Sequence, residues 1–306
     1  MTSPRSGLVT APGSRSLTAP GLVLVQIASL QLGSALAKDL FSEVGATATA
    51  ALRITLAALV LCAIVRPRLR SRSAPQWRAV LALGAVLAAM NLAYFHTIAR
   101  LPIGIASTLE LLGPLALAIV LTRRLSDLAW ALLSITGLLL LTAPGADLPM
   151  PGILLGLLAA GCRAAYVLLN RRVGQLFTDW SGLALALAAG AALLAPLGAV
   201  TGGARLLDPG VLAAGAGVAI LSSLLPYCLD LLVLRRISAR LFGILLSLSP
   251  AVGALVGLGA LGETLTAGQV VAIGLVMVAS AGAVAGDATA IRRARTPPDP
   301  ARARPR

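Results

Sequence analysis

Four ionisable residues lie inside long apolar stretches of this 306-residue sequence. Glu110 and Arg53 each stand eight residues into such a stretch, Arg163 lies about two-thirds through another, and Asp230 lies near the end of a fourth. If these stretches cross a membrane, each charge costs about 2.5–3.5 kcal/mol or more unless a cavity, a partner or a function offsets it. These four side chains are therefore the first candidates for chemistry.

Glu110 shares one helical face with Ser107 and Pro114, at spacings of three and four residues. A carboxyl in this position could take up and release a proton during a transport cycle, and it could also be the ion-pair partner of Arg53. Arg53 in turn could hold a substrate carboxylate through two parallel hydrogen bonds. The sequence favours a functional role for Glu110 and leaves both roles of Arg53 open.

The other two charges have simpler interpretations beside the functional one. Asp230 shares a face with Tyr227, and both could contact a substrate, although pairing with the nearby Arg235 or Arg236 is the simpler interpretation. Arg163 could reach a substrate or extend its charged end to the membrane surface. Both interpretations of Arg163 stay open.

Uncharged polar residues and one mixed-charge group complete the candidates. Asn91 and Tyr94 share a face late in one apolar stretch, and together they could contact a substrate. Lys38 precedes Asp39 and Glu43 between two apolar stretches. These three charges could form a gate, but a solvated loop is the default interpretation.

Cysteine and histidine give no sign of metal or nucleophilic chemistry. Cys62, Cys162 and Cys228 each fall inside an apolar run, and His96 is the only histidine. The sequence has no CxxC, HExxH or GxSxG motif. We therefore expect buried, inert thiols, no metal, no cofactor and no enzyme.

Composition indicates a protein that faces lipid. Hydrophobic residues make up 58% of the chain, charged residues only 12%, and the mean hydropathy is +0.92. Soluble domains carry about 25% charged residues, so too few remain here to cover a water-facing surface. The net charge of +14 could suggest nucleic acid binding, but the basic residues form short clusters between apolar stretches, which is typical of a membrane topology signal.

The elements that must position these side chains are ten apolar spans. A bilayer-spanning helix needs about 20 mostly apolar residues. We expect an all-α membrane protein with helices at 21–37, 46–65, 79–98, 103–122, 128–143, 152–169, 181–200, 211–234, 241–261 and 267–286. The expected partners are a small solute, protons and lipid, and the sequence also allows a homodimer.

Lysine and arginine divide unevenly between the two sides of these spans. Twenty of the 25 fall in the tails and in alternate connections, whereas Lys38, Arg100 and Arg205 fall on the other side. The positive-inside rule therefore places both termini in the cytoplasm of a bacterial inner membrane. Residues 1–20 and 287–306 read as disordered tails. A cleavable signal peptide ending near Ala37 would instead leave nine spans.

The two halves of the chain, 21–143 and 152–286, share a pattern. Arg100 precedes a span with Pro114, and Arg236 precedes a span with Pro250, at an offset of 136 residues in both cases. Five spans in each half predict two inverted repeats around a site near the membrane midplane, with alternating access by rocking one half against the other.

Pro114, Pro226 and Pro250 fall inside predicted spans. A proline in a helix removes one hydrogen bond and frees a carbonyl group. Such breaks occur where the backbone lines a cavity, and they also occur as simple packing kinks. The sequence predicts helix breaks at these three positions and leaves their purpose open.

Several motifs resemble the drug/metabolite transporter superfamily, EamA-domain type, and within it the bacterial threonine/homoserine exporters. The chain carries IASLQLG, ALAKDLF and ALR in the first two spans, and LPIGIA and LELLGPLA around the fourth. The second half adds AILSSLLPY, LFG, SPA and LGETLT. The resemblance runs from about residue 21 to 286, although the last motif is shared across the superfamily and says little about substrate.

The resemblance implies efflux of small neutral amino acids driven by the proton gradient. Three departures bear on the substrate: Arg163 stands where these exporters usually have an aromatic residue, Ser249 where many relatives have an acid, and Asp230 where they have a longer acid. An added cation and a lost acid favour a more anionic solute, so a transporter for another small molecule is the alternative.

Overall fold

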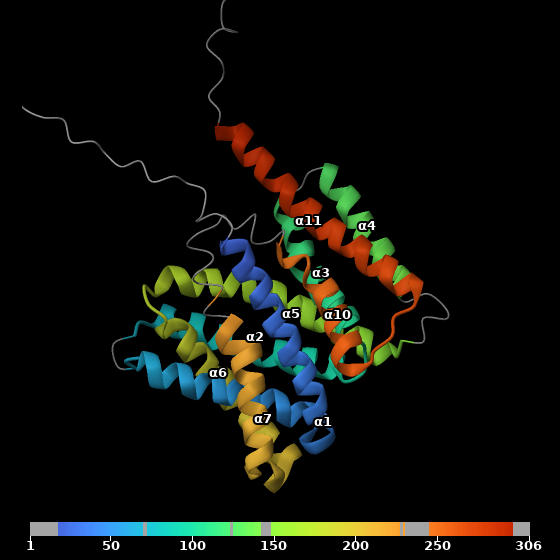
Figure 1. Cartoon of the computed structure of the whole chain (residues 1–306). Helices are drawn as coiled ribbons and strands as arrows, with labels where there is room; N and C mark the ends of the chain where they lie inside the picture. Colours follow the sequence, from blue (N-terminus) through green and yellow to red (C-terminus); the bar gives the residue numbers. More distant parts are fainter. Residues whose placement is uncertain are drawn as a thin grey trace, which may run out of the picture.

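The computed structural model describes residues 18–69, 72–122, 125–141, 148–226, 229 and 245–295, and they form a bundle of helices with short connections (Figure 1). The expectation of an all-α membrane protein is confirmed at this level. The elements are α1 (Thr18–Val65), α2 (Ala74–Ile98), α3 (Ile103–Thr122), α4 (Leu125–Leu141), α5 (Met150–Leu176), α6 (Ser181–Gly202), the 3₁₀ turn η1 (Gly203–Leu207), α7 (Pro209–Ala219), the π-helical turn η2 (Ile220–Leu224), α10 (Ser249–Leu261) and α11 (Ala267–Arg295).

Helix α1 is two helices that meet at Gly45. Gly45 has φ 79° and ψ 163°, a conformation that only glycine adopts without strain. The first part of α1 continues to Val44, so Lys38 and its two acidic neighbours are helical. The default interpretation of this segment as a solvated loop is therefore wrong. The chain changes direction between the two helices at Gly45 alone, so no longer loop is needed.

Two other helix ends differ from the sequence prediction, one at a helix start and one at a helix end. Helix α2 begins at Ala74 rather than at residue 79, after Ser73 and Gln76 form a capping box. Helix α11 continues past residue 286 to Arg295, so part of the expected C-terminal tail is helical.

The chain breaks just before Pro250, close to the expected helix break, because residues 245–246 are helical and α10 starts only after a short turn. Helix α10 begins at Ser249, which places Pro250 in its first turn, and residues 247–248 form a turn before it. A proline costs little there, because the N–H that it lacks would have no partner in the helix. The part of the predicted span at 241–244 lies outside the described residues.

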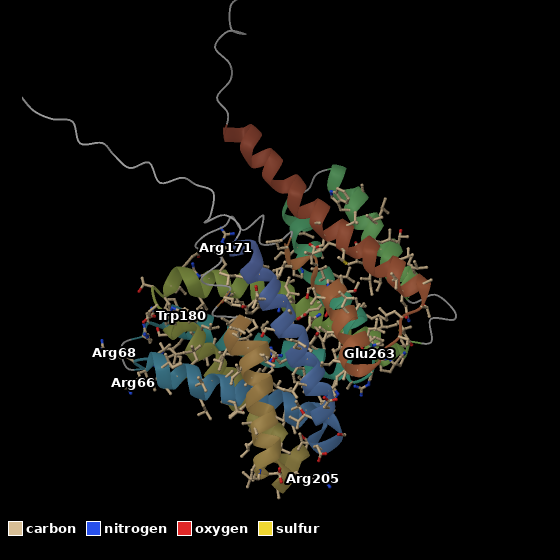
Figure 2. All side chains as sticks on the ribbon, viewed as in Figure 1. Arg66, Arg68, Arg171, Trp180, Arg205 and Glu263 are labelled. Atoms are coloured by element: carbon tan, nitrogen blue, oxygen red, sulfur yellow. The ribbon has the colours of Figure 1, made fainter. Side chains whose placement is uncertain are left out.

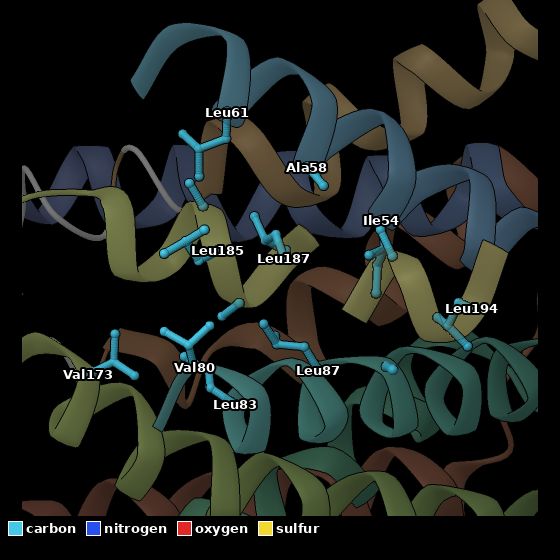
Figure 3. Packing of buried hydrophobic residues seen from close by; sticks show 14 of the residues in the cluster. Ile54, Ala58, Leu61, Val80, Leu83, Leu87, Val173, Leu185, Leu187 and Leu194 are labelled. Carbon is cyan, nitrogen blue, oxygen red and sulfur yellow. The ribbon is translucent and has the colours of Figure 1, made fainter. Parts of the chain in front are cut away.

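The interior is packed from small and branched side chains. Buried residues of α1, α2, α5 and α6 form a large cluster around Leu83, Leu87 and Leu187 (Figure 3). Close helix crossings depend on glycine: a Cβ atom at Gly84 of α2 would lie 2.7 Å from the Ala186 carbonyl oxygen of α6. Small residues of this kind let helix backbones approach in membranes.

The outer surface of the bundle is apolar along the helices. Among the described residues, four helical stretches are long and apolar enough to cross a bilayer: α1, α2, α5 and the stretch from α6 through η1. The other apolar helices are shorter. Large apolar side chains stand exposed on many of these helices, among them Leu59, Leu81, Leu132, Leu154 and Leu255. Such surface is stable against lipid and not against water.

Candidate functional site

Arg53 lies buried in the second part of α1, with 6% of its surface exposed. Its Nε donates to Ser223 Oγ at 2.8 Å, and its Nη2 donates to the Ser222 carbonyl oxygen at 2.5 Å. The guanidinium carbon lies 5.3 Å from the centre of the Phe95 ring. Polar acceptors and an aromatic face therefore hold this buried cation in one orientation.

The backbone around Ser222 can accept this bond because the helix is irregular there. Residues 220–224 form the π-helical turn η2, and Leu225 N donates to the Ile220 carbonyl, five residues back. Pro226 has no N–H to give to Ser222, its partner four residues back in an α-helix. The neighbouring Leu221 carbonyl accepts from Ser29 Oγ at 2.6 Å. Two side chains of α1 thus take up the carbonyls that the break exposes.

Glu110 of α3 forms an ion pair with Arg163 of α5, at 3.6 Å between Oε1 and Nη1. The Glu110 and Arg163 side chains are 16% and 28% exposed. The guanidinium of Arg163 also lies 5.7 Å from the Tyr166 ring centre. The sequence did not predict this pair; it considered Arg53 as the partner of Glu110, and either a substrate or the membrane surface as the place for the Arg163 charge.

Glycine and proline place α3 and α5 close together at this pair. A Cβ atom at Gly113 would lie 1.9 Å from the Ala160 carbonyl oxygen, so the two backbones touch there. Pro114 lies inside α3 and leaves the Glu110 carbonyl, four residues back, without an N–H partner. The close crossing brings Arg163, one turn beyond Ala160, within reach of Glu110.

Tyr94 of α2 lies near residues that contact or neighbour both charged groups. It is 6% exposed, its hydroxyl lies 3.5 Å from Ser107 Oγ, one turn before Glu110, and the next residue, Phe95, has its ring against the Arg53 guanidinium. Asn91, one turn earlier, is also buried, but its Nδ2 donates to the Leu87 carbonyl of its own helix at 2.8 Å. Tyr94 therefore belongs to a shared polar region with Glu110 and Arg53, whereas the Asn91 amide nitrogen is occupied locally.

A second ionic contact joins three distant segments. Lys38 Nζ lies 2.5 Å from Glu263 Oε1 and also donates to the Leu101 carbonyl at 3.3 Å. Glu263 Oε2 accepts from the backbone N–H of Ile103, at the start of α3, at 2.8 Å. Gly257 makes room, since a Cβ there would lie 2.2 Å from Glu263 Oε2. We call this contact the Lys38–Glu263 clasp.

Sequence reasoning missed Glu263, although a signal was present. Glu263 is the only acidic residue between positions 231 and 286. It belongs to the LGETLT motif, which the sequence interpretation treated as uninformative because it is shared so widely. A lone acid beside a span needs a partner, and the structure supplies Lys38.

A hollow of about 560 Å³ opens near the clasp, between α1 and the η1–α7 segment. Its charged lining residues are Asp39, Glu43, Arg205 and Asp208. Arg205 donates to the Glu43 carbonyl at 3.3 Å, and Asp208 accepts from two backbone N–H groups at the start of α7. The hollow is lined by none of the residues around Arg53 or Glu110.

Two predicted site residues, Tyr227 and Asp230, lie outside the described residues. Within the described part of the chain, no three His, Cys, Asp or Glu side chains are grouped so as to hold a metal ion. The arrangement offers a fixed buried cation, a carboxylate in an ion pair and hydroxyl groups between them. These groups can bind a small polar solute and exchange a proton.

A membrane bundle with a buried arginine, an ion pair between two helices and irregular helices is typical of the class of transporters. Comparison with known proteins gives the family. Residues 150–285 match the EamA-like transporter family. The chain is 39% identical to the threonine/homoserine exporter RhtA of Escherichia coli K12 and 38% identical to that of Salmonella typhimurium LT2, each over 85% of this chain and 89% of the relative.

This chain belongs to the EamA-like transporter family and is a homologue of the RhtA exporters. It is a transporter and not an enzyme, as the sequence predicted. A crystal structure of another protein shares the fold, with a TM-score of 0.60 at 21% identity over 90% of this chain and 99% of that one.

Proposed function

We propose that this protein exports small neutral amino acids such as threonine and homoserine across the bacterial inner membrane in exchange for protons. The names of its relatives support the substrate. The observation that carries the mechanism is the presence of two charge groups inside the bundle, the buried Arg53 held by η2 and the partly buried Glu110 paired with Arg163, with Tyr94 close to Ser107 on the Glu110 helix.

In this proposal Arg53 binds the substrate carboxylate. A guanidinium matches a carboxylate through parallel hydrogen bonds, and Arg53 is already oriented by Ser223 and Phe95. Tyr94 contacts the rest of the solute, and we retain Asn91, Tyr227 and Asp230 as further candidate contacts.

Glu110 carries the coupling proton. While Glu110 is ionised, it holds Arg163 and so ties α3 to α5. Protonation removes the attraction between the two side chains and frees the helices to move apart. Proton uptake at this pair is thereby linked to a change in helix packing, which is what antiport requires.

The proposed architecture is two inverted five-helix halves, 21–143 and 152–286. Helix packing supports it, because α3 packs on α10, α4 on α11 and the second part of α1 on α6, which are corresponding elements of the two halves. Two further contacts would be related to each other by the proposed repeat. In one, α2 of the first half packs on α5 of the second half, and in the other, their counterparts η2 and the first part of α1 pack on each other. An inverted repeat would place Arg53 and Glu110 between moving parts.

Counterflow in proteoliposomes tests the substrate. Vesicles preloaded with unlabelled homoserine should take up labelled homoserine in a saturable way, and unlabelled threonine should compete. Arg53→Lys should weaken homoserine about tenfold, because an ammonium group cannot form the paired bonds of a guanidinium. Empty vesicles are the control, and an absence of saturable uptake with either amino acid refutes the substrate.

The coupling proposal has a separate test. Glu110→Gln should abolish export driven by an imposed proton gradient and leave counterflow, which needs no net proton movement, largely intact. Glu43→Gln, at an exposed acid of the hollow, is the matched control and should behave like the unaltered protein. Gradient-driven export that survives Glu110→Gln contradicts the assignment.

A second candidate function is transport of a different, more anionic solute by the same fold. Arg163 beside Glu110 favours it, because this cation lies next to the proposed site and departs from the exporters' usual aromatic residue. Thermal stabilisation in detergent by a set of amino acids and organic acids separates the two functions. Stabilisation by homoserine supports the first, and stabilisation by an organic acid alone supports the second.

A further inference from the structure

Gln31 occupies the centre of the first part of α1, and its side chain is fully buried. Its Nε2 donates to Ser107 Oγ of α3 at 2.7 Å and to the Ser249 carbonyl at the start of α10 at 3.0 Å. Gly253 leaves space for the amide, since a Cβ there would lie 2.3 Å from Nε2. The nitrogen end of this amide is therefore fixed between two other helices.

The oxygen end is not satisfied in the same way. Gln31 Oε1 is buried and has no hydrogen-bond partner in the described part of the chain. Exchanging the amide oxygen and nitrogen does not help, because it would set two acceptors, Oε1 and the Ser249 carbonyl, against each other. A buried acceptor without a donor loses its hydration and gains nothing in return, so its presence needs an explanation.

The location of Gln31 indicates what the missing donor is. Ser107, which accepts from Gln31, also lies 3.5 Å from the Tyr94 hydroxyl, and Glu110 follows one turn later on α3. The Gln31 amide group therefore adjoins the proposed substrate region. Gln26, on the same helix, is buried with an unpartnered Oε1 as well, but within the described residues no hydrogen bond links its side chain to Ser107 or Tyr94.

We propose that Gln31 Oε1 accepts a hydrogen bond from the α-ammonium group of the exported amino acid. This inference rests on the proposed function. A substrate carboxylate has no proton to donate, whereas an ammonium group offers three donors. In the proposed function Arg53 takes the carboxylate, so Gln31 and Arg53 together would select a zwitterion.

The test compares two ligands that differ in the ammonium group. Homoserine has it, and 4-hydroxybutanoate has the same carboxylate and hydroxyl groups without it. Dissociation constants for both are measured on the full-length protein in detergent. Gln31→Leu should weaken homoserine about tenfold and leave 4-hydroxybutanoate within about twofold, so that the preference for homoserine falls about tenfold.

Two further variants separate the role of the oxygen from that of the scaffold. Gln31→Glu keeps oxygen acceptors but loses both Nε2 bonds, and it should retain the preference for homoserine. Gln26→Leu makes the same substitution five residues away and should leave the preference unchanged. Because the preference is a ratio measured on one sample, a general loss of stability does not alter it.

Three outcomes would overturn the inference. They are equal weakening of both ligands by Gln31→Leu, unchanged homoserine affinity in that variant, and the same change of preference in Gln26→Leu. Failure of the unaltered protein to bind homoserine would instead overturn the proposed function, and this inference with it.

Discussion

Gly113 shows how closely a single residue controls the proposed site. A Cβ atom at this position would lie 1.9 Å from the Ala160 carbonyl oxygen, so the backbones of α3 and α5 meet there. This contact lies one turn from both members of the Glu110–Arg163 pair. Any side chain at position 113 must push α5 away and lengthen the ion pair.

We therefore expect Gly113→Ala to destabilise the protein. Overpacking costs about 1–3 kcal/mol, which exceeds the gain of about 1 kcal/mol in helix propensity. The melting temperature in detergent should fall by several degrees. Gly161→Ala is the matched control, because nothing lies within 4 Å of its Cβ position, and it should leave the melting temperature unchanged or raise it. Equal behaviour of the two variants would contradict the close-contact explanation.

The sequence identified the charged residues at this scale and did not identify their partners. Glu110, Arg53 and Arg163 were visible because any charge in an apolar run is conspicuous. The Glu110–Arg163 pair depends on how α3 crosses α5, and Gln31 depends on Ser249 far along the chain. Such contacts are set by tertiary packing, which spacing within one helix does not encode.

At the scale of elements, the Lys38–Glu263 clasp ties α1, the start of α3 and the α10–α11 connection together. Under the proposed topology these segments lie at the outer face, so the clasp closes that side of the site. Alternating access requires it to open, because a substrate cannot leave past three joined segments.

We expect Lys38→Met to open the outer side. In a variant without native cysteines, Ser34→Cys provides the probe, since Ser34 is 1% exposed and lies one turn inward from Lys38. A membrane-impermeant maleimide added outside should label it about tenfold faster when the clasp is broken, which corresponds to a shift of about 1.4 kcal/mol. Lys38→Arg keeps the charge and should stay slow, as should Asp39→Asn. Equal labelling of Lys38→Met and Lys38→Arg would exclude an ionic clasp.

The sequence predicted helix boundaries correctly where the length of an apolar run sets them. It predicted them less well where a single residue sets them. The span at 103–122 agrees with α3 at both ends. The first span was ended too early because Lys38 and its acidic neighbours suggested a loop, whereas Gly45 alone makes the turn. The sequence indicated a break near Pro250, but it did not show that the turn lies at residues 247–248 and leaves Pro250 in the first turn of α10.

At the scale of the whole molecule, apolar composition and the run of spans were enough to predict a helical membrane bundle. Family membership followed from motifs spread along the chain and agrees with 39% identity to an exporter over most of its length. How the helices contact one another could not be read from the sequence, because every span is apolar on most of its faces. The packing of α4 against α11, which are far apart in the sequence, is visible only in the structure.

The distribution of basic residues predicts how the bundle is oriented in the membrane. Arg66, Arg68 and Arg171 gather at one end of the bundle, whereas Arg205 and Glu263 lie away from it (Figure 2). Twenty of the 25 basic residues fall on the side of the first group in the sequence-based topology. Because cytoplasmic connections carry the excess of arginine and lysine, we expect this end and both termini to face the cytoplasm.

Cysteine labelling in intact cells measures this directly. In a variant without native cysteines, Arg205→Cys should react with a membrane-impermeant maleimide from outside, since Arg205 is exposed on the opposite side. Arg68→Cys and Arg172→Cys, also exposed, should react only after the membrane is permeabilised, as should a cysteine added at either terminus. Termini on opposite sides would require an odd number of crossings. That result would contradict the proposed inverted repeat, and with it the proposal that Arg53 and Glu110 lie between two moving halves.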